Sequence, residues 1–304
     1  MKFFKNIKEF FLNFFGLTKL LSNVKNIAII LLAFYLSNSV LDWRKLIIGI
    51  ISLSLISSAI YIYNNLCDIK IDKYNEHKNY YSKAVMYFGE KYTLIFVVIF
   101  IVSGLYFGFI INFYFLISLI ALLVTGFLYS FKYTRFKEKA VLDVLFGATF
   151  TFLFRFIASW FIFSISTPPL LAMIALVSAK SAGYMLYKEV DRVFLTSLNI
   201  KNSITVANKK TIVVMSTLLW FLSFFSFVFL CLNAKYFNVR YLGKLPIKFL
   251  FLMPFAILPL TIIYLSVLNK IKIQIRHLRI MGFLYWILVI IIIWNLYSWL
   301  KINF

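Results

Sequence analysis

The sequence is poor in charged residues, which cover the surface of a water-soluble protein. They make up 14% of its 304 residues, against 63% hydrophobic residues, and the mean hydropathy is +0.92. A soluble globular domain carries about 25% charged residues, so this class is excluded. We therefore expect an integral membrane protein for which the bilayer is the main solvent.

Cysteine and histidine are scarce as well. The two cysteines, Cys67 and Cys231, are predicted near opposite membrane surfaces, so no structural disulfide is expected. The two histidines, His77 and His277, fall in predicted loops without other ligands at the spacing of a closed zinc site. We interpret both histidines as surface residues.

Glycine and proline are too few to mark a linker or a series of broken helices. The chain has 10 Gly and 5 Pro, and its hydrophobic segments show no internal repeat. This favours a single domain over residues 1–304. It disfavours a lipid transporter, which would carry repeats and interrupted helices, although Arg155 and Lys180 could line a path in one.

What the sequence does contain is nine hydrophobic stretches that approach the roughly 20 residues needed to cross a bilayer. They cover residues 26–41, 46–63, 93–111, 113–130, 141–165, 168–187, 211–233, 249–268 and 280–300. We predict an all-α fold, a polytopic bundle of about nine transmembrane helices. Residues 1–22 mix Lys with Phe and Leu at helical spacing and predict an interfacial amphipathic helix, with a signal peptide as the alternative.

Lys and Arg residues are distributed unequally between the loops. With the N-terminus inside, the inner segments 1–25, 64–92, 131–140, 188–210 and 269–279 hold 5, 5, 4, 5 and 4 of them, 23 in all, and the outer segments hold 7. Cationic loops stay in the cytoplasm, so we predict a cytoplasmic N-terminus in a bacterial cytoplasmic membrane. The net charge of +22 then reflects topology and attraction to lipid headgroups, and no nucleic acid partner is expected.

Acidic residues are the rarest charged class, and nine of the ten fall on the predicted inner side. Carboxylates are costly near lipid, which makes them functional candidates. Asn64, Asp68 and Asp72 end the second stretch at positions i, i+4 and i+8, so a continuous helix would place all three on one face. Mg²⁺ takes one or two carboxylates and completes its shell with phosphate oxygens and water. These three residues are therefore candidate metal ligands, with a solvated helix end as the structural alternative.

The string from Asn64 to Asp72 resembles the first aspartate-rich motif of the UbiA prenyltransferase superfamily, N-D-x-x-D-x-x-x-D. Asn65 stands where that motif has its first Asp, which weakens one potential ligand. The resemblance implies a magnesium-dependent transferase that uses a diphosphate-bearing donor and an isoprenoid lipid, with Asp68, Asp72 and Asn64 as catalytic metal ligands. The family's second motif, D-x-x-x-D, is degenerate here and spans Tyr187 to Asp191.

Three further positions resemble one branch of that superfamily, the polyprenyl-phosphate phosphoribosyltransferases. Arg155 matches the Arg of F-x-x-R-x-x-A-G, Lys180 the Lys of K-R-Y-x-E, and Lys78 the leading Lys of K-R-x-R-P. An Arg inside a span needs a partner, so Arg155 could instead form a structural pair with Asp143 or with backbone carbonyls.

These resemblances imply phosphate-binding roles for Lys78, Arg155, Lys180 and Lys188, and they add Asp191 as a further substrate-binding candidate. We expect transfer of phosphoribose from phosphoribosyl diphosphate to a polyprenyl phosphate. Prenyl transfer from a prenyl diphosphate to an aromatic or other small acceptor is the alternative.

Overall fold

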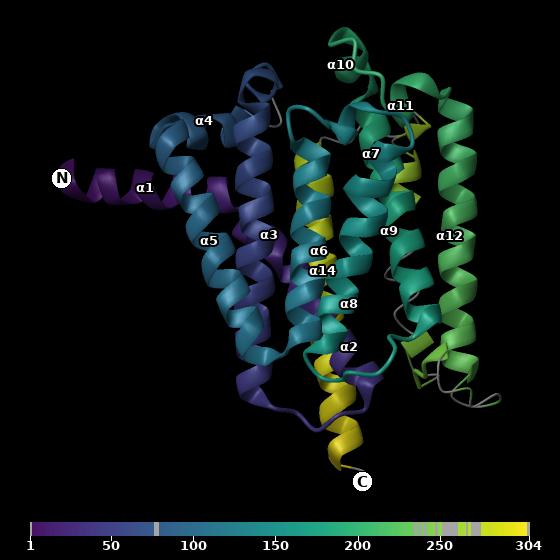
Figure 1. Ribbon diagram of the computed structural model, residues 1–304. Coiled ribbons are helices and arrows are strands. Elements are labelled where there is room, and N and C mark those ends of the chain that lie inside the picture. The colour runs from purple at the N-terminus through teal and green to yellow at the C-terminus, as the bar shows by residue number, and fades with distance from the viewer. Residues whose placement is uncertain are drawn as a thin grey trace.

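The structure is a computed structural model. The structure describes residues 2–75, 79–233, 236, 239, 242–246, 249–250, 261–265, 267–268 and 275–302. Helices dominate these residues, which contain no strand, and the long helices run side by side in one bundle (Figure 1). The all-α prediction is confirmed.

Seven described helical segments are long and apolar enough to cross a membrane. They are η1 and α2 (Leu20–Asn23 and Val24–Ser37), α3 (Trp43–Asp72), α5 (Glu90–Ile111), α6 (Phe113–Ser130), α7 to α8 (Leu142–Val144, then η3 at Leu145–Thr149 and Phe150–Phe161), α9 (Leu170–Val190) and α12 (Lys209–Leu232). They correspond to the first seven predicted stretches. The ninth stretch lies within α14 (Ile275–Ile302), and most of the eighth, 249–268, lies outside the described residues, so a count of nine stays a prediction.

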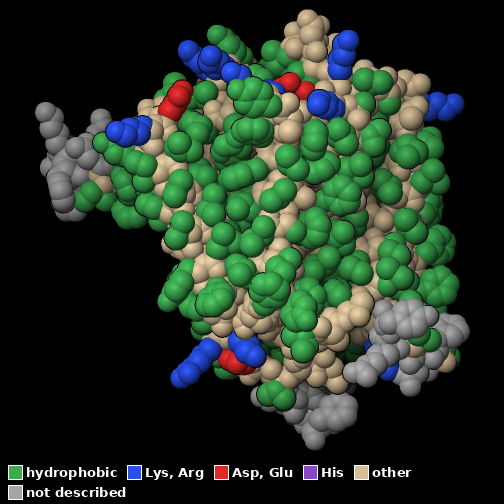
Figure 2. Space-filling model, in the orientation of Figure 1, with side chains coloured by type: hydrophobic (Ala, Val, Ile, Leu, Met, Phe, Trp, Pro, Cys, Tyr) green, Lys and Arg blue, Asp and Glu red, His purple; other side chains and the backbone are tan. Residues whose placement is uncertain are grey.

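The surface agrees with a location in the bilayer. Hydrophobic side chains form a broad belt around the middle of the visible face, and charged side chains gather at its two ends (Figure 2). The short helices α4 (Asn79–Phe88), α10 (Arg192–Ser197) and α11 (Ser203–Val206) all lie at one end of the bundle, which is the predicted inner end (Figure 1). The chain is therefore an integral membrane protein.

The first helix, α1 (Lys2–Thr18), lies across the bundle instead of along it (Figure 1). Phe10, Phe11 and Phe15 on this helix are exposed, as an apolar face in contact with lipid would be. At its end the carbonyl of Leu17 accepts a hydrogen bond of 3.2 Å from Asn65 Nδ2 on α3. This arrangement is what the predicted interfacial helix requires.

Helix α3 carries the motif and is continuous for 30 residues. Asp42 caps its outer end, where the side chain accepts hydrogen bonds from the backbone N–H groups of Arg44 and Lys45 at 2.9 and 3.2 Å. Near its middle, Ser52 Oγ donates to the carbonyl of Gly104 on α5 at 2.7 Å, which holds the two helices in close contact. The anchored helix delivers its last turns to the inner end of the bundle.

The fifth span departs from the predicted uninterrupted stretch 141–165. Residues Leu145–Thr149 form a π-helical turn, η3, and the helix ends at Phe161. Gly147 in this turn allows two tyrosines to approach: a Cβ atom there would lie 2.8 Å from Tyr129 Cε2 and 2.9 Å from the Tyr184 hydroxyl oxygen. A π-turn of this kind is often found beside a functional site.

Candidate active site

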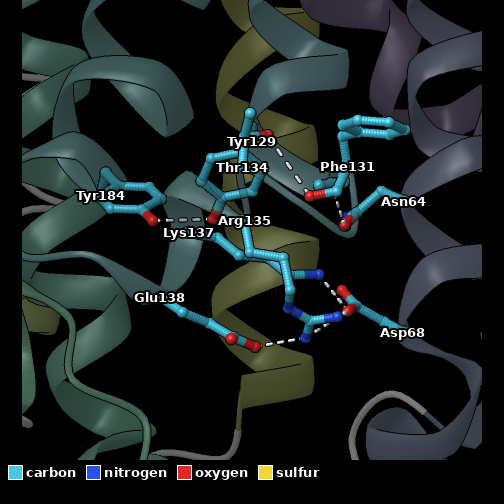
Figure 3. A network of polar contacts seen from close by, with 10 residues as sticks. Asn64, Asp68, Tyr129, Phe131, Thr134, Arg135, Lys137, Glu138 and Tyr184 are labelled. Carbon is cyan, nitrogen blue, oxygen red and sulfur yellow. Dashed lines mark hydrogen bonds and ion pairs between the residues drawn. The ribbon is translucent and has the colours of Figure 1, made fainter.

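Helix α3 runs without interruption through Asn64, Asp68 and Asp72, which we call the carboxylate row. Asn64 Oδ1 accepts a hydrogen bond of 2.8 Å from Ser130 Oγ at the end of α6 (Figure 3). Asp68 Oδ1 accepts from Lys137 Nζ in the segment that follows α6. Asn64 and Asp68 therefore both face the stretch of chain from Ser130 to Lys137, as residues four apart on one face of a helix can.

Two cations and a second carboxylate surround Asp68 (Figure 3). Lys137 forms an ion pair with it, and Arg135 NH2 lies 4.0 Å from the same oxygen. Glu138 pairs with Arg135, and its hydrogen bond raises the pKa of that guanidinium above its ordinary value. In the sequence, Arg135 and Lys137 are two of the four basic residues in the inner segment 131–140, and no local pattern singles them out.

Asn65 does not belong to the carboxylate row. Its side chain is 2% exposed and faces α1, where Nδ2 donates to Leu17, while Oδ1 has no hydrogen-bond partner among the described residues. The weakened metal ligand at position 65 stays a prediction, and the amide NH₂ group of Asn65 faces α1. Asp72 is also buried, at 7% exposure, at the last turn of α3.

The degenerate second motif lies at the inner end of α9. Glu189 accepts two hydrogen bonds of 2.7 Å from Arg192 at the start of α10, so its charge is already balanced by a neighbouring residue. Asp191 is buried and caps the helix. Lys188 Nζ rests 5.4 Å from the centroid of the Tyr184 ring.

Tyr184 connects this region to the carboxylate row. Its hydroxyl lies 2.9 Å from that of Tyr129 on α6, one residue before Ser130, and the pair spans the gap between α6 and α9 (Figure 3). Helix α6 therefore contacts both helices that carry a motif region, α3 through Ser130 and α9 through Tyr129. No local pattern in the sequence points to this tyrosine pair.

The remaining candidates lie deeper or outside the described residues. Arg155 is 3% exposed and donates from NH2 to Ser57 Oγ at 3.4 Å, a long hydrogen bond. A structural pair between Arg155 and Asp143 is wrong, because Asp143 Oδ1 accepts instead from the backbone N–H of Ser203 at 3.2 Å and from its hydroxyl. Lys180 lies on α9, two turns from Lys188 toward the membrane centre. Lys78, like His77, lies outside the described residues.

The donor set suits a metal that is shared with a substrate. Across the described part of the chain, no three His, Cys, Asp or Glu side chains gather as a metal cage. Mg²⁺ needs no such cage, because it binds one or two carboxylates together with phosphate oxygens. Asp68, Asp72 and the amide of Asn64 provide hard oxygen donors, and the adjacent Lys137 and Arg135 suit a polyphosphate. The residues fit a magnesium diphosphate.

The model of the UbiA prenyltransferase family matches residues 26–287. The chain belongs to this family. In this UbiA-family protein, the first motif on α3 and the second motif region on α9 both lie within the matched residues. No curated protein matches the sequence.

Solved structures of UbiA homologs show the same fold. A homolog from Archaeoglobus fulgidus bound to GPP and Mg²⁺ is 16% identical with a TM-score of 0.74, and the match covers 94% of this chain and 99% of that one. The apo homolog from Aeropyrum pernix K1 is 13% identical with a TM-score of 0.70 over 91% and 98%. A digeranylgeranylglyceryl phosphate synthase structure is 15% identical with a TM-score of 0.62 over 93% and 98%.

Proposed function

We propose that this protein is a magnesium-dependent intramembrane transferase that uses a diphosphate-bearing donor and an isoprenoid lipid. The observation that carries the proposal is the carboxylate row on α3 with Lys137 and Arg135 beside Asp68. A metal site alone would not require these cations, and an anion site alone would not require the carboxylates. A magnesium diphosphate requires both.

The proposed chemistry depends on Asp68 releasing Lys137 and Arg135 when it binds a metal ion. In either candidate reaction, the bond between a carbon and a diphosphate oxygen breaks, and negative charge grows on the leaving group. Asp68, Asp72 and Asn64 would hold Mg²⁺, which offsets that charge when bound. Lys137 and Arg135 then exchange Asp68 for diphosphate oxygens, and such fixed charges act strongly in a site shielded from water. Lys188, whose Nζ lies beside the Tyr184 ring of the tyrosine pair, is a further candidate for binding diphosphate oxygens.

We propose phosphoribosyl diphosphate as the donor and a polyprenyl phosphate as the acceptor. Arg155, which is buried, and Lys180, which is partly buried, lie in spans where cations are costly. They support this choice because two substrate phosphates would offset that cost. Prenyl transfer to an aromatic or other small acceptor is the second candidate. It is favoured by the Archaeoglobus fulgidus homolog, whose structures hold GPP or DMAPP with Mg²⁺.

The site lies at the end of the bundle that the distribution of Lys and Arg predicts to be cytoplasmic, and we propose that orientation. Phosphoribosyl diphosphate is a soluble, highly charged molecule, so an opening toward the cytoplasm would give it access. The acceptor would arrive from the surrounding lipid.

The test is diphosphate release by purified protein in lipid nanodiscs, with Mg²⁺ and each donor in turn. Asp68→Ala and Asp72→Ala should each lower turnover by at least about 100-fold, as expected for the loss of a group that stabilises developing charge. Asp42→Ala is the matched control, because it removes an acid from the opposite end of the same helix. Unchanged turnover in both inner variants would refute the proposal.

A further inference from the structure

Three cations lie deep in the bundle, away from the carboxylate row. Lys25 on α2, Arg155 on α8 and Lys180 on α9 come from three different spans, and their charges act on one another. Within the described residues, none of the three has a carboxylate at ion-pair distance. We call these residues the deep cation cluster. A charge inside a span is costly and usually has a functional reason.

The groups around the cluster are neutral, and donors outnumber acceptors. Lys25 Nζ contacts the hydroxyl of Tyr61, and Ser57 Oγ accepts both from Arg155 and from Asn26 Nδ2, the latter at 3.2 Å. Arg155 Nε is fully buried and has no hydrogen-bond partner among the described residues. An arginine has five N–H donors, and leaving them unused in the interior is unfavourable. The arrangement lacks an anionic acceptor.

The cluster lies directly below the carboxylate row on the same face of α3. Tyr61 precedes Asp68 by seven residues and Ser57 precedes Asn64 by seven, which is two turns in each case. With a rise of 1.5 Å per residue, Tyr61 lies about 10 Å deeper in the membrane than Asp68. The cluster is therefore a separate group of residues, about two turns of α3 away from the carboxylate row and along the same face of that helix.

We propose that the deep cation cluster binds a phosphate monoester. This inference rests on the proposed function and specifies its second substrate: the phosphate headgroup of the isoprenoid acceptor, whose tail extends into lipid. The 5-phosphate of phosphoribosyl diphosphate has the same chemistry and is the other source of such a group. Guanidinium and ammonium groups together recognise phosphate by charge and by paired hydrogen bonds.

The absence of a carboxylate from the described part of this cluster fits a phosphate nucleophile. An oxygen of the lipid phosphate dianion attacks the anomeric carbon, a new C–O bond forms, and the bond to the diphosphate breaks with its electron pair leaving on the diphosphate. No proton is transferred, so no general base is required. A phenol or alcohol acceptor would have to lose a proton, and a base would have to stand within hydrogen-bond reach.

Binding measurements separate the sources. The probes are farnesyl phosphate, farnesol and ribose 5-phosphate, titrated against the full chain in nanodiscs without Mg²⁺. The wild type should bind farnesyl phosphate more tightly than farnesol, and Lys25→Met should weaken farnesyl phosphate binding by at least about 30-fold. Lys25→Arg should retain most of the affinity. Lys70→Met, at an exposed position on α3, is the matched control and should change nothing.

Stability provides the second readout. Lys25→Met removes a partly buried cation that repels two others, so the ligand-free variant should unfold at a higher temperature than the wild type. If the lysine had a structural role, its removal would lower the unfolding temperature. Weaker binding of ribose 5-phosphate alone would support the phosphate site but assign it to the donor. Unchanged binding of both phosphates would overturn the inference.

A magnesium diphosphate titration keeps this inference distinct from the proposed function. Lys25→Met should leave the affinity for magnesium diphosphate unchanged, and Asp68→Ala should weaken it. If Asp68→Ala has no effect while Lys25→Met still weakens phosphate binding, the transferase proposal fails and the phosphate site stands. If both variants weaken magnesium diphosphate equally, the cluster is part of the diphosphate site and the inference is wrong.

Discussion

Replacing Lys137 with methionine tests whether the carboxylate row exchanges its protein partner for a metal. Lys137 donates to Asp68 Oδ1, and its side chain is only 9% exposed. A divalent ion that binds this carboxylate must displace the ammonium group. Without diphosphate, Lys137→Met should therefore bind Mn²⁺ more tightly than the wild type. With Mg²⁺ present, it should bind diphosphate less tightly, because one phosphate partner is gone.

The size of both effects follows from the ion pair. A hydrogen bond between charged groups contributes about 1.5 to 3 kcal/mol, which corresponds to a factor of about 10 to 150 in affinity. Arg135 stays 4.0 Å from Asp68 in the variant and retains part of the competition, so the lower end applies. We expect Mn²⁺ binding to tighten about tenfold and magnesium diphosphate binding to weaken by about the same factor.

The assay is a Mn²⁺ titration followed by electron paramagnetic resonance, paired with calorimetry of diphosphate binding, both in nanodiscs. Lys139→Met is the control. Lys139 Nζ lies 5.5 Å from the Phe136 ring centroid and, within the described residues, forms no ion pair with the carboxylate row, so both affinities should stay at wild-type values. Mn²⁺ affinity that is unchanged or reduced in Lys137→Met would show that Lys137 does not compete for Asp68.

Two further substitutions test the surroundings of the site. Gly147→Ala should cost about 1 to 3 kcal/mol of stability and lower the unfolding temperature, because its methyl group would lie 2.9 Å from the Tyr184 hydroxyl oxygen. Gly183→Ala, which meets nothing within 4 Å, should be neutral or stabilising by up to about 1 kcal/mol, and an equal loss in both would contradict this. Asn65→Asp should destabilise the protein by about 1 to 3 kcal/mol, because two acceptors would face each other at Leu17, and Mn²⁺ affinity should not rise. A gain in Mn²⁺ affinity would mean that position 65 faces the metal.

The spans could be predicted from the sequence because crossing a bilayer is a local property of length and apolarity. The predicted stretch 113–130 coincides with α6, and α3 extends beyond its stretch to Asp72. The π-turn at 145–149 could not be predicted, because it accommodates the side chains of Tyr129 and Tyr184 on other helices.

The candidate site could be predicted only where its members lie close together along one helix. The spacing of Asn64, Asp68 and Asp72 is visible in the sequence, whereas the contact of Asp68 with Lys137 joins residues 69 positions apart and leaves no local pattern. Lys25 was counted among the loop cations, because a lysine at the inner end of a span is ordinarily a topology signal. Only the packing of α2 near α8 shows that it faces Arg155.

The hydrogen bond between Asn65 and the carbonyl of Leu17 would fix the depth of the candidate site in the membrane, because it ties α3 to α1. With this amphipathic helix resting among the headgroups, as predicted, the last two turns of α3 are attached to the lipid surface itself. Bilayers of different thickness must then be accommodated at the opposite face, near the link between α2 and α3. The candidate site would then lie at the boundary between water and lipid in each membrane. The diphosphate-bearing donor would stay in water and the isoprenoid chain of the acceptor in the bilayer.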